Sequence, residues 1–405
     1  MQESGHAKST VPSKGARTRP AIPSLLRTLN DRAALDLFLQ HGRLSRVDIA
    51  RMAGVSKPTA SQLLARLEDA HLVMAVGLEG GRSGRAAQQY ELNPRFAYAA
   101  ALDVTEHHID AALADVTGRV IAQVREKTPR RRGASGPQQA TAALNTTLKS
   151  AKVRHRDVGC VVMAVAGAHD VDTDHLRYAK HLSGWQGVQV IEELEALTAI
   201  PFIVENDVNL AALAERRVGA ARNVSDFFLF WVDEGIGGAL VIDDKIHRGG
   251  TGSAGEMTFL QVPGIDVVRN PVRGNVGGFE ELVGEASLLA LARSLGIEGG
   301  TQVEIVSTAV TRDDPNADGF LNEIASRYAI GLSSVIAVVD PSAIILAGSV
   351  MAAGGSDLRA RIEGQLLEVA ITVPAIHLST VPDNPVLAGA LCASLDRTRD
   401  LAFTT

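Results

Sequence analysis

The side chains best suited to bind a hydroxylated ligand are Asn206 and Asp207, which stand side by side where a predicted strand ends and a predicted helix begins. An amide beside a carboxylate can both donate and accept hydrogen bonds, as a sugar hydroxyl requires. Two carboxylates near glycine-rich turns, Glu256 and Glu280, add further acceptors. A plainer interpretation stays open at this point: Asp207 would only cap the helix, and Glu256 would be a surface acid.

A second group of residues is suited to contact nucleic acid. Short polar side chains and cations gather at the start of another predicted helix: Ser56, Lys57, Thr59, Ser61, Gln62 and Arg66. Such side chains contact phosphates and the edges of bases. Further along, Arg82 and Arg85 lie among glycines, whose bare backbone would let the guanidinium groups enter a narrow minor groove. Taken alone, this loop could equally be an ordinary hairpin with solvated arginines.

The elements that must position these side chains are readable from capping and turn signals. A helical pattern starts at Asp31 and ends at Gly42. Ser45, with Asp48 three residues on, approximates a capping box for a second helix, and Ser56 caps a third. Two short helices joined by a turn that contains glycine form a helix-turn-helix, whose third helix would enter the major groove by its N-terminal end.

A predicted hairpin follows these helices. Strands at 72–76 and 88–92 flank the loop that carries the two arginines. The order of three helices and then a hairpin is typical of a winged helix, and the loop is its wing. This order favours the minor-groove interpretation of Arg82 and Arg85 over the solvated one.

Charge is divided unevenly along the chain. Met1 to Arg95 holds 14 Lys and Arg against 8 Asp and Glu, a balance of +6, whereas the remainder holds 26 against 38, a balance of −12. A basic head on an acidic body suggests that the head meets a polyanion and the body does not. Residues 1–22 are polar and mildly basic, and we expect them to form a flexible arm.

Composition excludes several classes of protein. Two cysteines cannot make a disulfide framework or a four-cysteine zinc site. No run of about 18 apolar residues is present, so no membrane-spanning helix and no membrane partner is expected. The polar start of the chain has no apolar segment of the kind found in secretory signals. Together these features predict a protein of the reducing cytoplasm.

The chain beyond Pro94 predicts an α/β body of two similar lobes. Twice, strands joined by hairpins are followed by alternating helices and strands. The predicted strands are 98–104, 109–115, 119–124, 159–165, 202–205, 228–232, 237–242, 245–247 and 343–346. The predicted helices are 138–151, 208–218, 279–294, 319–339, 358–370 and 386–395. A cleft between two such lobes is a usual place for a small ligand.

Three segments of this body resemble the ROK family (repressor, open reading frame, kinase): 204–212, the pair 233–238 and 249–256, and 277–280. The resemblance covers roughly residues 25–400 and includes the winged helix that marks the repressor branch of the family. It implies an α/β fold with a winged helix-turn-helix at 23–95 and an actin-like, ribonuclease H-like domain of two lobes at 96–405. It also implies that Asn206, Asp207, Glu256 and Glu280 contact a sugar-like effector.

The departures from the family pattern argue against ATP use. In kinase members the first hairpin turn is Asp-x-Gly-Gly-Thr, and its backbone approaches the ATP phosphates. Here that turn is 103–107, which lacks both glycines and has Glu106 where phosphate would lie. In the second phosphate turn, Asp233 and Glu234 replace Gly-Thr. Close backbone approach needs glycine, and a polyanion avoids carboxylates.

The zinc motif of the family is also missing. Four residues that are not plausible zinc ligands occupy the matching positions: Phe259, Pro271, Arg273 and Gly278. The sequence therefore predicts neither a metal site nor a cofactor. The Asp170, Asp172 and Asp174 triplet lacks the glycine and glutamate of a calcium loop, and we expect a solvated turn.

The sequence as a whole predicts a transcriptional repressor without kinase activity that binds double-stranded operator DNA and senses a sugar. A dimer or tetramer reading an inverted repeat is expected, because one small head supplies limited contacts. Two alternatives remain. One is a DNA-binding protein with a purely structural body; the other is an ATP-dependent sugar kinase in which Asp207 acts as general base.

Overall fold

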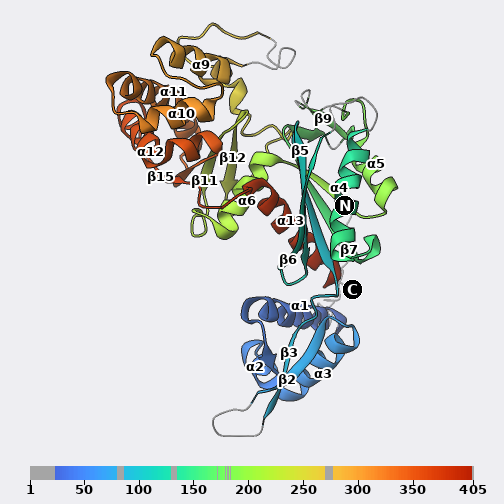
Figure 1. The fold of residues 1–405 in the computed structure, drawn as a ribbon. Helices are drawn as coiled ribbons and strands as arrows, with labels where there is room; N and C mark the ends of the chain where they lie inside the picture. Colours follow the sequence, from blue (N-terminus) through green and yellow to red (C-terminus); the bar gives the residue numbers. More distant parts are fainter. Residues whose placement is uncertain are drawn as a thin grey trace, which may run out of the picture. The chain divides into compact units, whose positions relative to one another are not determined.

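The computed structural model describes residues 23–79, 86–128, 135–170, 172–177, 179, 182, 184–269 and 277–403 (Figure 1). The chain forms two units, which are described separately. The first holds the described residues up to Asn93 together with Phe403, and the second runs from Pro94 to Ala402. No helix among the described residues is long and apolar enough to cross a membrane.

The first unit is the predicted winged helix. Its elements are α1 (Pro23–His41), β1 (Leu44–Ser45), α2 (Arg46–Met52), α3 (Lys57–Asp69), β2 (Val73–Glu79) and β3 (Ala87–Leu92), and its sheet has the order β1-β3-β2. The expected caps are present. The Ser45 hydroxyl accepts from the Asp48 amide while Asp48 accepts from the Ser45 amide, and Ser56 caps α3. The first helix starts eight residues before the predicted Asp31.

One residue from the end of the chain belongs to this first unit. Phe403 is 6% exposed, and the guanidinium of Arg32 on α1 lies 5.5 Å from the centre of its ring. A cation over an aromatic face is attracted by the ring quadrupole. The head is therefore completed by a residue from the far end of the sequence.

The second unit contains two five-stranded sheets with the same strand order. The first sheet runs β10-β7-β4-β5-β6 and the second β15-β14-β11-β12-β13. In each sheet, the strand that comes earliest in the sequence pairs antiparallel with the strand that follows it in the sequence and parallel with a later strand. The strands of the first sheet are β4 (Tyr98–Val104), β5 (His108–Asp115), β6 (Val120–Lys127), β7 (Val158–Val165) and β10 (Phe202–Asn206). Those of the second are β11 (Phe227–Val232), β12 (Ile236–Ile242), β13 (Lys245–His247), β14 (Ala343–Ala347) and β15 (Ala375–Leu378). The two similar lobes that the sequence predicts are confirmed.

Helices cover both sheets (Figure 1). The first sheet packs on α4 (Gly136–Ala151) and α5 (Val190–Thr198) through one shared core. The second packs on a helical layer that contains α8 (Gly278–Val283), α9 (Glu285–Ser294), α10 (Gln302–Thr311), α11 (Pro315–Val339) and α12 (Ser349–Val369). A third core joins side chains of both sheets to α6 (Asp207–Val218) and α13 (Pro385–Ala402). These two helices therefore connect the lobes.

A glycine allows α6 and α13 to come close. A Cβ atom on Gly389 would lie 1.8 Å from the carbonyl oxygen of Leu210 on α6. No larger residue fits there unless the backbones separate. This close crossing holds the ends of both helices at the same cleft.

Several boundaries differ from the sequence prediction. The single helix expected over 279–294 is two helices, because Gly284 is extended and a Cβ there would lie 2.5 Å from the carbonyl oxygen of Glu280. Helix α12 starts nine residues earlier than expected, and a left-handed Gly355 kinks it. Helix α13 runs on to Ala402. The prediction missed α5, α10, β15 and the short hairpin of β8 (Ala168–Asp170) and β9 (His175–Arg177).

Candidate functional site

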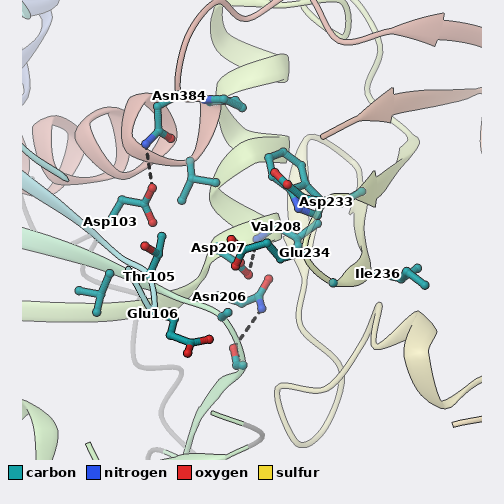
Figure 2. A pocket seen from close by; sticks show the side chains of 18 of the residues that line it. Asp103, Thr105, Glu106, Asn206, Asp207, Val208, Asp233, Glu234, Ile236 and Asn384 are labelled. Carbon is teal, nitrogen blue, oxygen red and sulfur yellow. Dashed lines mark hydrogen bonds between the residues drawn. The ribbon is translucent and has the colours of Figure 1, made fainter. Parts of the chain in front are cut away.

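A cleft of about 630 Å³ lies between the lobes of the second unit (Figure 2). Its wall includes the turn between β4 and β5, the turn between β11 and β12, and the first residues of α6 and α13. All four residues predicted to contact an effector line it: Asn206, Asp207, Glu256 and Glu280. The structure thus brings together side chains that are up to 74 positions apart in sequence.

Asn206 is the cap of α6. Its Oδ1 accepts from the amide of Asn209 at 3.0 Å, and its Nδ2 donates to the carbonyl oxygen of Gly167 at 3.0 Å. The alternative that Asp207 caps this helix is wrong, because Asp207 is the first helical residue. Each polar atom of Asn206 keeps one further hydrogen-bonding position for a ligand.

Asp207 lies at the start of α6 and is half-buried. One carboxylate oxygen accepts from the amide of Val208 at 2.9 Å. Burial, joined by the negative charges of Asp103 and Glu256, raises the pKa of Asp207 to about 7. Burial also raises the pKa values of Glu256 and Glu280. With a pKa of about 7, the Asp207 carboxyl can donate as well as accept a hydrogen bond near neutral pH.

The floor of the cleft contains a buried carboxylate that the sequence analysis did not select as a site residue. Asp103 is 6% exposed and accepts at Oδ2 from Nδ2 of Asn384 at 2.8 Å (Figure 2). The same Nδ2 lies 3.1 Å from Asp110, which Arg125 holds with two hydrogen bonds of 2.7 Å. Burial raises the pKa of Asp103 to about 6, although Asn384 opposes the shift. The signal that could have identified these residues is a pair of acids inside apolar strands.

In the second lobe, a carboxylate in the turn between β11 and β12 lies beside the start of α12. Gly348 precedes α12 with φ of 95°, and a Cβ there would lie 2.2 Å from the carbonyl oxygen of Val232. The Ser349 hydroxyl donates to Oδ1 of Asp233 at 2.6 Å. The positive end of α12, which attracts anions, therefore already has an anionic neighbour from within the chain.

The turns of the two lobes meet at the cleft. His107 follows Glu106 in the first turn, and its Nε2 lies 3.8 Å from Oε1 of Glu234 in the second. Both Glu106 and Glu234 line the cleft. Each turn thus presents a carboxylate to the cleft.

The expected absence of zinc ligands can be compared with the structure at two of the four positions. Phe259 lines the cleft, and Gly278 starts α8. Pro271 and Arg273 lie outside the described residues. Among the residues that the structure does describe, no group of three or more His, Cys, Asp and Glu side chains is arranged to hold a metal ion.

The acidic triplet at 170–174 has structural partners. Asp170 pairs with Arg177 and accepts from the amide of Asp172. Asp174 accepts from the amides of Ile191 and Glu192 at the start of α5. These contacts account for both side chains without a bound ion.

The predicted DNA-contacting side chains occupy the exposed start of α3 and one later turn. Ser56 and Thr59 bond to each other at 2.8 Å, and Ser61 donates to the backbone of Lys57 at 2.9 Å. Lys57 and Gln62 are exposed, and neither side chain has a hydrogen bond or ion pair with another described residue.

Arg66 has an internal partner. Its guanidinium donates to Asp31 on α1 at 2.6 Å. To contact a DNA phosphate, Arg66 would therefore have to share its guanidinium with Asp31 or give up that ion pair. Arg82 and Arg85 lie outside the described residues.

Both units of the chain match models of known protein families. Residues 99–395 match the ROK family model, and residues 27–74 match a winged helix-turn-helix DNA-binding model. The xylose repressor of Bacillus subtilis is 22% identical over 335 residues, 82% of this chain and 85% of the repressor.

Solved structures give the same result for the fold. A ROK family transcriptional regulator described as a homolog of the E. coli MLC protein matches with a TM-score of 0.74 at 18% identity, covering 94% of this chain and 99% of that regulator. A ROK family glucokinase from Streptomyces griseus, solved with glucose and AMPPNP, matches with a TM-score of 0.59 at 23% identity, over 74% of this chain and all of the glucokinase. The family model spans well over half of the sequence, and the chain belongs to the ROK family.

Proposed function

We propose that the chain is a DNA-binding transcriptional repressor whose body senses a sugar and has no kinase activity. One observation carries the proposal: a winged helix-turn-helix is joined to a sugar-kinase-like cleft whose turns present Glu106, Asp233 and Glu234. The repressor and the transcriptional regulator among its relatives support the first part. The acidic turns support the second, because ATP would bring phosphates against carboxylates.

The head would read operator DNA as part of a homodimer or homotetramer in the cytoplasm. The exposed Lys57 and Gln62 would contact the DNA from the start of α3, and Arg82 and Arg85 would do so from the wing. A single head offers few contacts, so two heads on an inverted repeat are needed for tight binding. A ligand changes this binding only if it has different affinities for the DNA-bound and free conformations.

The DNA part is tested with duplexes selected by the full-length protein from a random-sequence pool. Lys57→Ala should weaken binding roughly tenfold and lower the slope of log K against log salt by about one unit, because one phosphate contact is lost. Lys245→Ala, on β13 of the body, is the matched control and should bind as the wild type does. Equal binding by all three proteins would contradict the role of α3.

The sensing part is tested by thermal shift against a panel of sugars and sugar phosphates, followed by the effect of any ligand on DNA affinity. Stabilisation that disappears in Asn206→Ala and Asp207→Ala would assign sensing to the cleft. A panel without any effect on melting or on DNA affinity would favour a regulator with a structural body. Sugar-dependent release of ADP from ATP would establish a kinase and overturn the proposal.

A further inference from the structure

We infer that the cleft selects a polyhydroxylated ligand that carries a protonated amine and that it rejects phosphorylated sugars. The inference rests on the proposed sensor function and specifies the ligand class of the same cleft.

Carboxylates dominate the lining of the cleft. Eight of its residues are acids: Asp103, Glu106, Asp207, Asp233, Glu234, Glu256, Glu280 and Asp383. Two are basic, Arg125 and His108. Cations are attracted into such a cavity and anions are repelled, and the low-dielectric walls strengthen both effects.

Both basic side chains already lie beside the buried Asp110. Arg125 gives two hydrogen bonds of 2.7 Å to the buried Asp110. His108 lies 3.1 Å from the hydroxyl of Thr105 through Nδ1 and 3.5 Å from Asp110 through Nε2. The positive charge of Arg125 is therefore already offset by Asp110, and the charge that a phosphate would meet in the cleft stays negative.

Asp103 supplies an acceptor that the protein leaves unused. Its side chain is 94% buried, it lines the cleft, and its Oδ2 binds Asn384. No described residue donates a hydrogen bond to its other oxygen. This oxygen is not fully buried, so it can accept a hydrogen bond from a ligand that brings a donor into the cleft.

A protonated amine matches this wall better than any neutral group. An ammonium group has three donors and no acceptor, whereas a hydroxyl has one donor and acceptor lone pairs. Asn206, Asp207 and Glu256 remain for the hydroxyls of the ligand. Glu106 and Glu234 line the same cleft as Asn206 and Asp207 (Figure 2), so a ligand in that cleft faces both groups.

The helix end that would otherwise favour an anion already has a carboxylate beside it. Asp233 accepts from Ser349 at 2.6 Å at the start of α12. A phosphate there would lie against this carboxylate. The second turn therefore adds repulsion of an anion rather than a binding position for it.

The test is calorimetric titration of the full-length protein with matched sets of sugars, at a pH below the pKa of the sugar amine. The probes are glucose, mannose and galactose, their 2-amino, 3-amino and 6-amino forms, and their 6-phosphates. At least one amino sugar should bind about tenfold more tightly than its neutral parent. It should bind at least about 100-fold more tightly than the corresponding phosphate.

Two variants separate the turns from the rest of the cleft. Glu106→Gln with Glu234→Gln should reduce the preference for the amine about tenfold while the protein melts as the wild type does. Glu298→Gln, an exposed acid outside the cleft lining, is the matched control and should leave the preference unchanged. An unchanged preference in the double variant overturns the role of the turns.

The outcomes distinguish this inference from the sensor function itself. Neutral or phosphorylated sugars that bind as tightly as the amino forms would overturn the ligand class and leave the sensor intact. Binding of none of the probes, with no effect of any probe on DNA affinity, would overturn both. Amine-selective binding that is lost in Asp207→Ala supports both.

Discussion

The two sheets of the body share one strand order but differ in what fills them. The first lobe places acids among small side chains: Asp103 and Asp110 are buried on neighbouring strands with Ala101 and Ala112. The second lobe uses aromatic rings, with Phe230 packed 6.3 Å from Phe279 and 5.6 Å from Tyr328 between ring centres. Buried acids need hydrogen-bond partners, whereas rings contribute mainly apolar area.

The comparison shows that two sheets with the same strand order can have different roles, because their side chains differ. The first lobe carries a charged network that reaches the cleft through Asp103 and Arg125. The second lobe supplies a large apolar core and presents its acids from turns, as Asp233 and Glu234 do. We therefore expect stability to depend most on the second lobe and pH response to depend most on the first.

The largest effect should come from the aromatic core. Phe230→Ala removes a fully buried ring and both of its aromatic contacts, so the free energy of unfolding should fall by about 3–5 kcal/mol. Urea unfolding of the body measures this. Val338→Ala, at a side chain that is 85% exposed, is the control and should change stability by less than about 0.5 kcal/mol. Similar values for the two variants would contradict the assignment of the second lobe as the scaffold.

A smaller effect is expected from the amide that serves both buried acids. Asn384→Ala leaves Asp103 without its donor and removes the cap of α13, where Oδ1 of Asn384 accepts from Leu387. The free energy of unfolding should fall by about 1–3 kcal/mol. Asn322→Ala, at an exposed amide bonded to Asp318, is the matched control. Equal losses in the two variants would show that the network adds nothing beyond a surface hydrogen bond.

The pH dependence of stability sharpens the comparison further. The pKa values of Asp103 and Asp207 rise from 3.8 to about 6 and about 7. Between pH 4 and pH 7 the folded state keeps protons that the unfolded state has released, so these two groups make the protein less stable as pH rises.

Asp207→Asn tests this sign. The variant should be about 1 kcal/mol more stable than the wild type at pH 8, and the difference should disappear below about pH 3, where the carboxyl is neutral in both states. Thermal unfolding at a series of pH values measures the slope. Asp313→Asn, at an exposed acid, should keep the slope of the wild type. A wild-type protein whose stability rises from pH 5 to pH 8 would contradict the prediction.

The smallest effect concerns the one described ion pair between the two turns. The side chains of His107 and Glu234 are 53% and 73% exposed. His107→Ala should therefore change the free energy of unfolding by less than about 0.5 kcal/mol, and that change should disappear in high salt. Denaturant unfolding at two salt concentrations is sufficient. A loss above 1 kcal/mol would mean that the turns hold the lobes together.

Local signals explain why much of the fold was predictable. Ser45 and Ser56 cap helices through residues three positions away, and such pairs are visible in sequence. The break at Gly284 was missed because glycine in a helical pattern is tolerated until a close contact, here with Glu280, requires it. The predicted start of helix α12 is nine residues too late because the first residues of this helix carry little apolar periodicity.

Only some of the residues that line the candidate site could be selected from the sequence, for a related reason. Asn206 and Asp207 were identifiable because they stand together between a strand and a helix. The bond between Asp103 and Asn384 joins residues 281 positions apart, so no local pattern reports it. The position of Asp103 in the cleft and the bond between Ser349 and Asp233 at the start of α12 also depend on tertiary structure alone.

The place of Phe403 has a consequence for engineering. The polypeptide enters the head at its beginning and returns to it at its end, so the head is not a contiguous cassette. A fragment that stops at Asn93 would lack the ring beneath Arg32 and would expose the surface that this ring covers. A chimera that joins this head to another body must therefore supply an aromatic residue in the place of Phe403; without it the head would be incomplete.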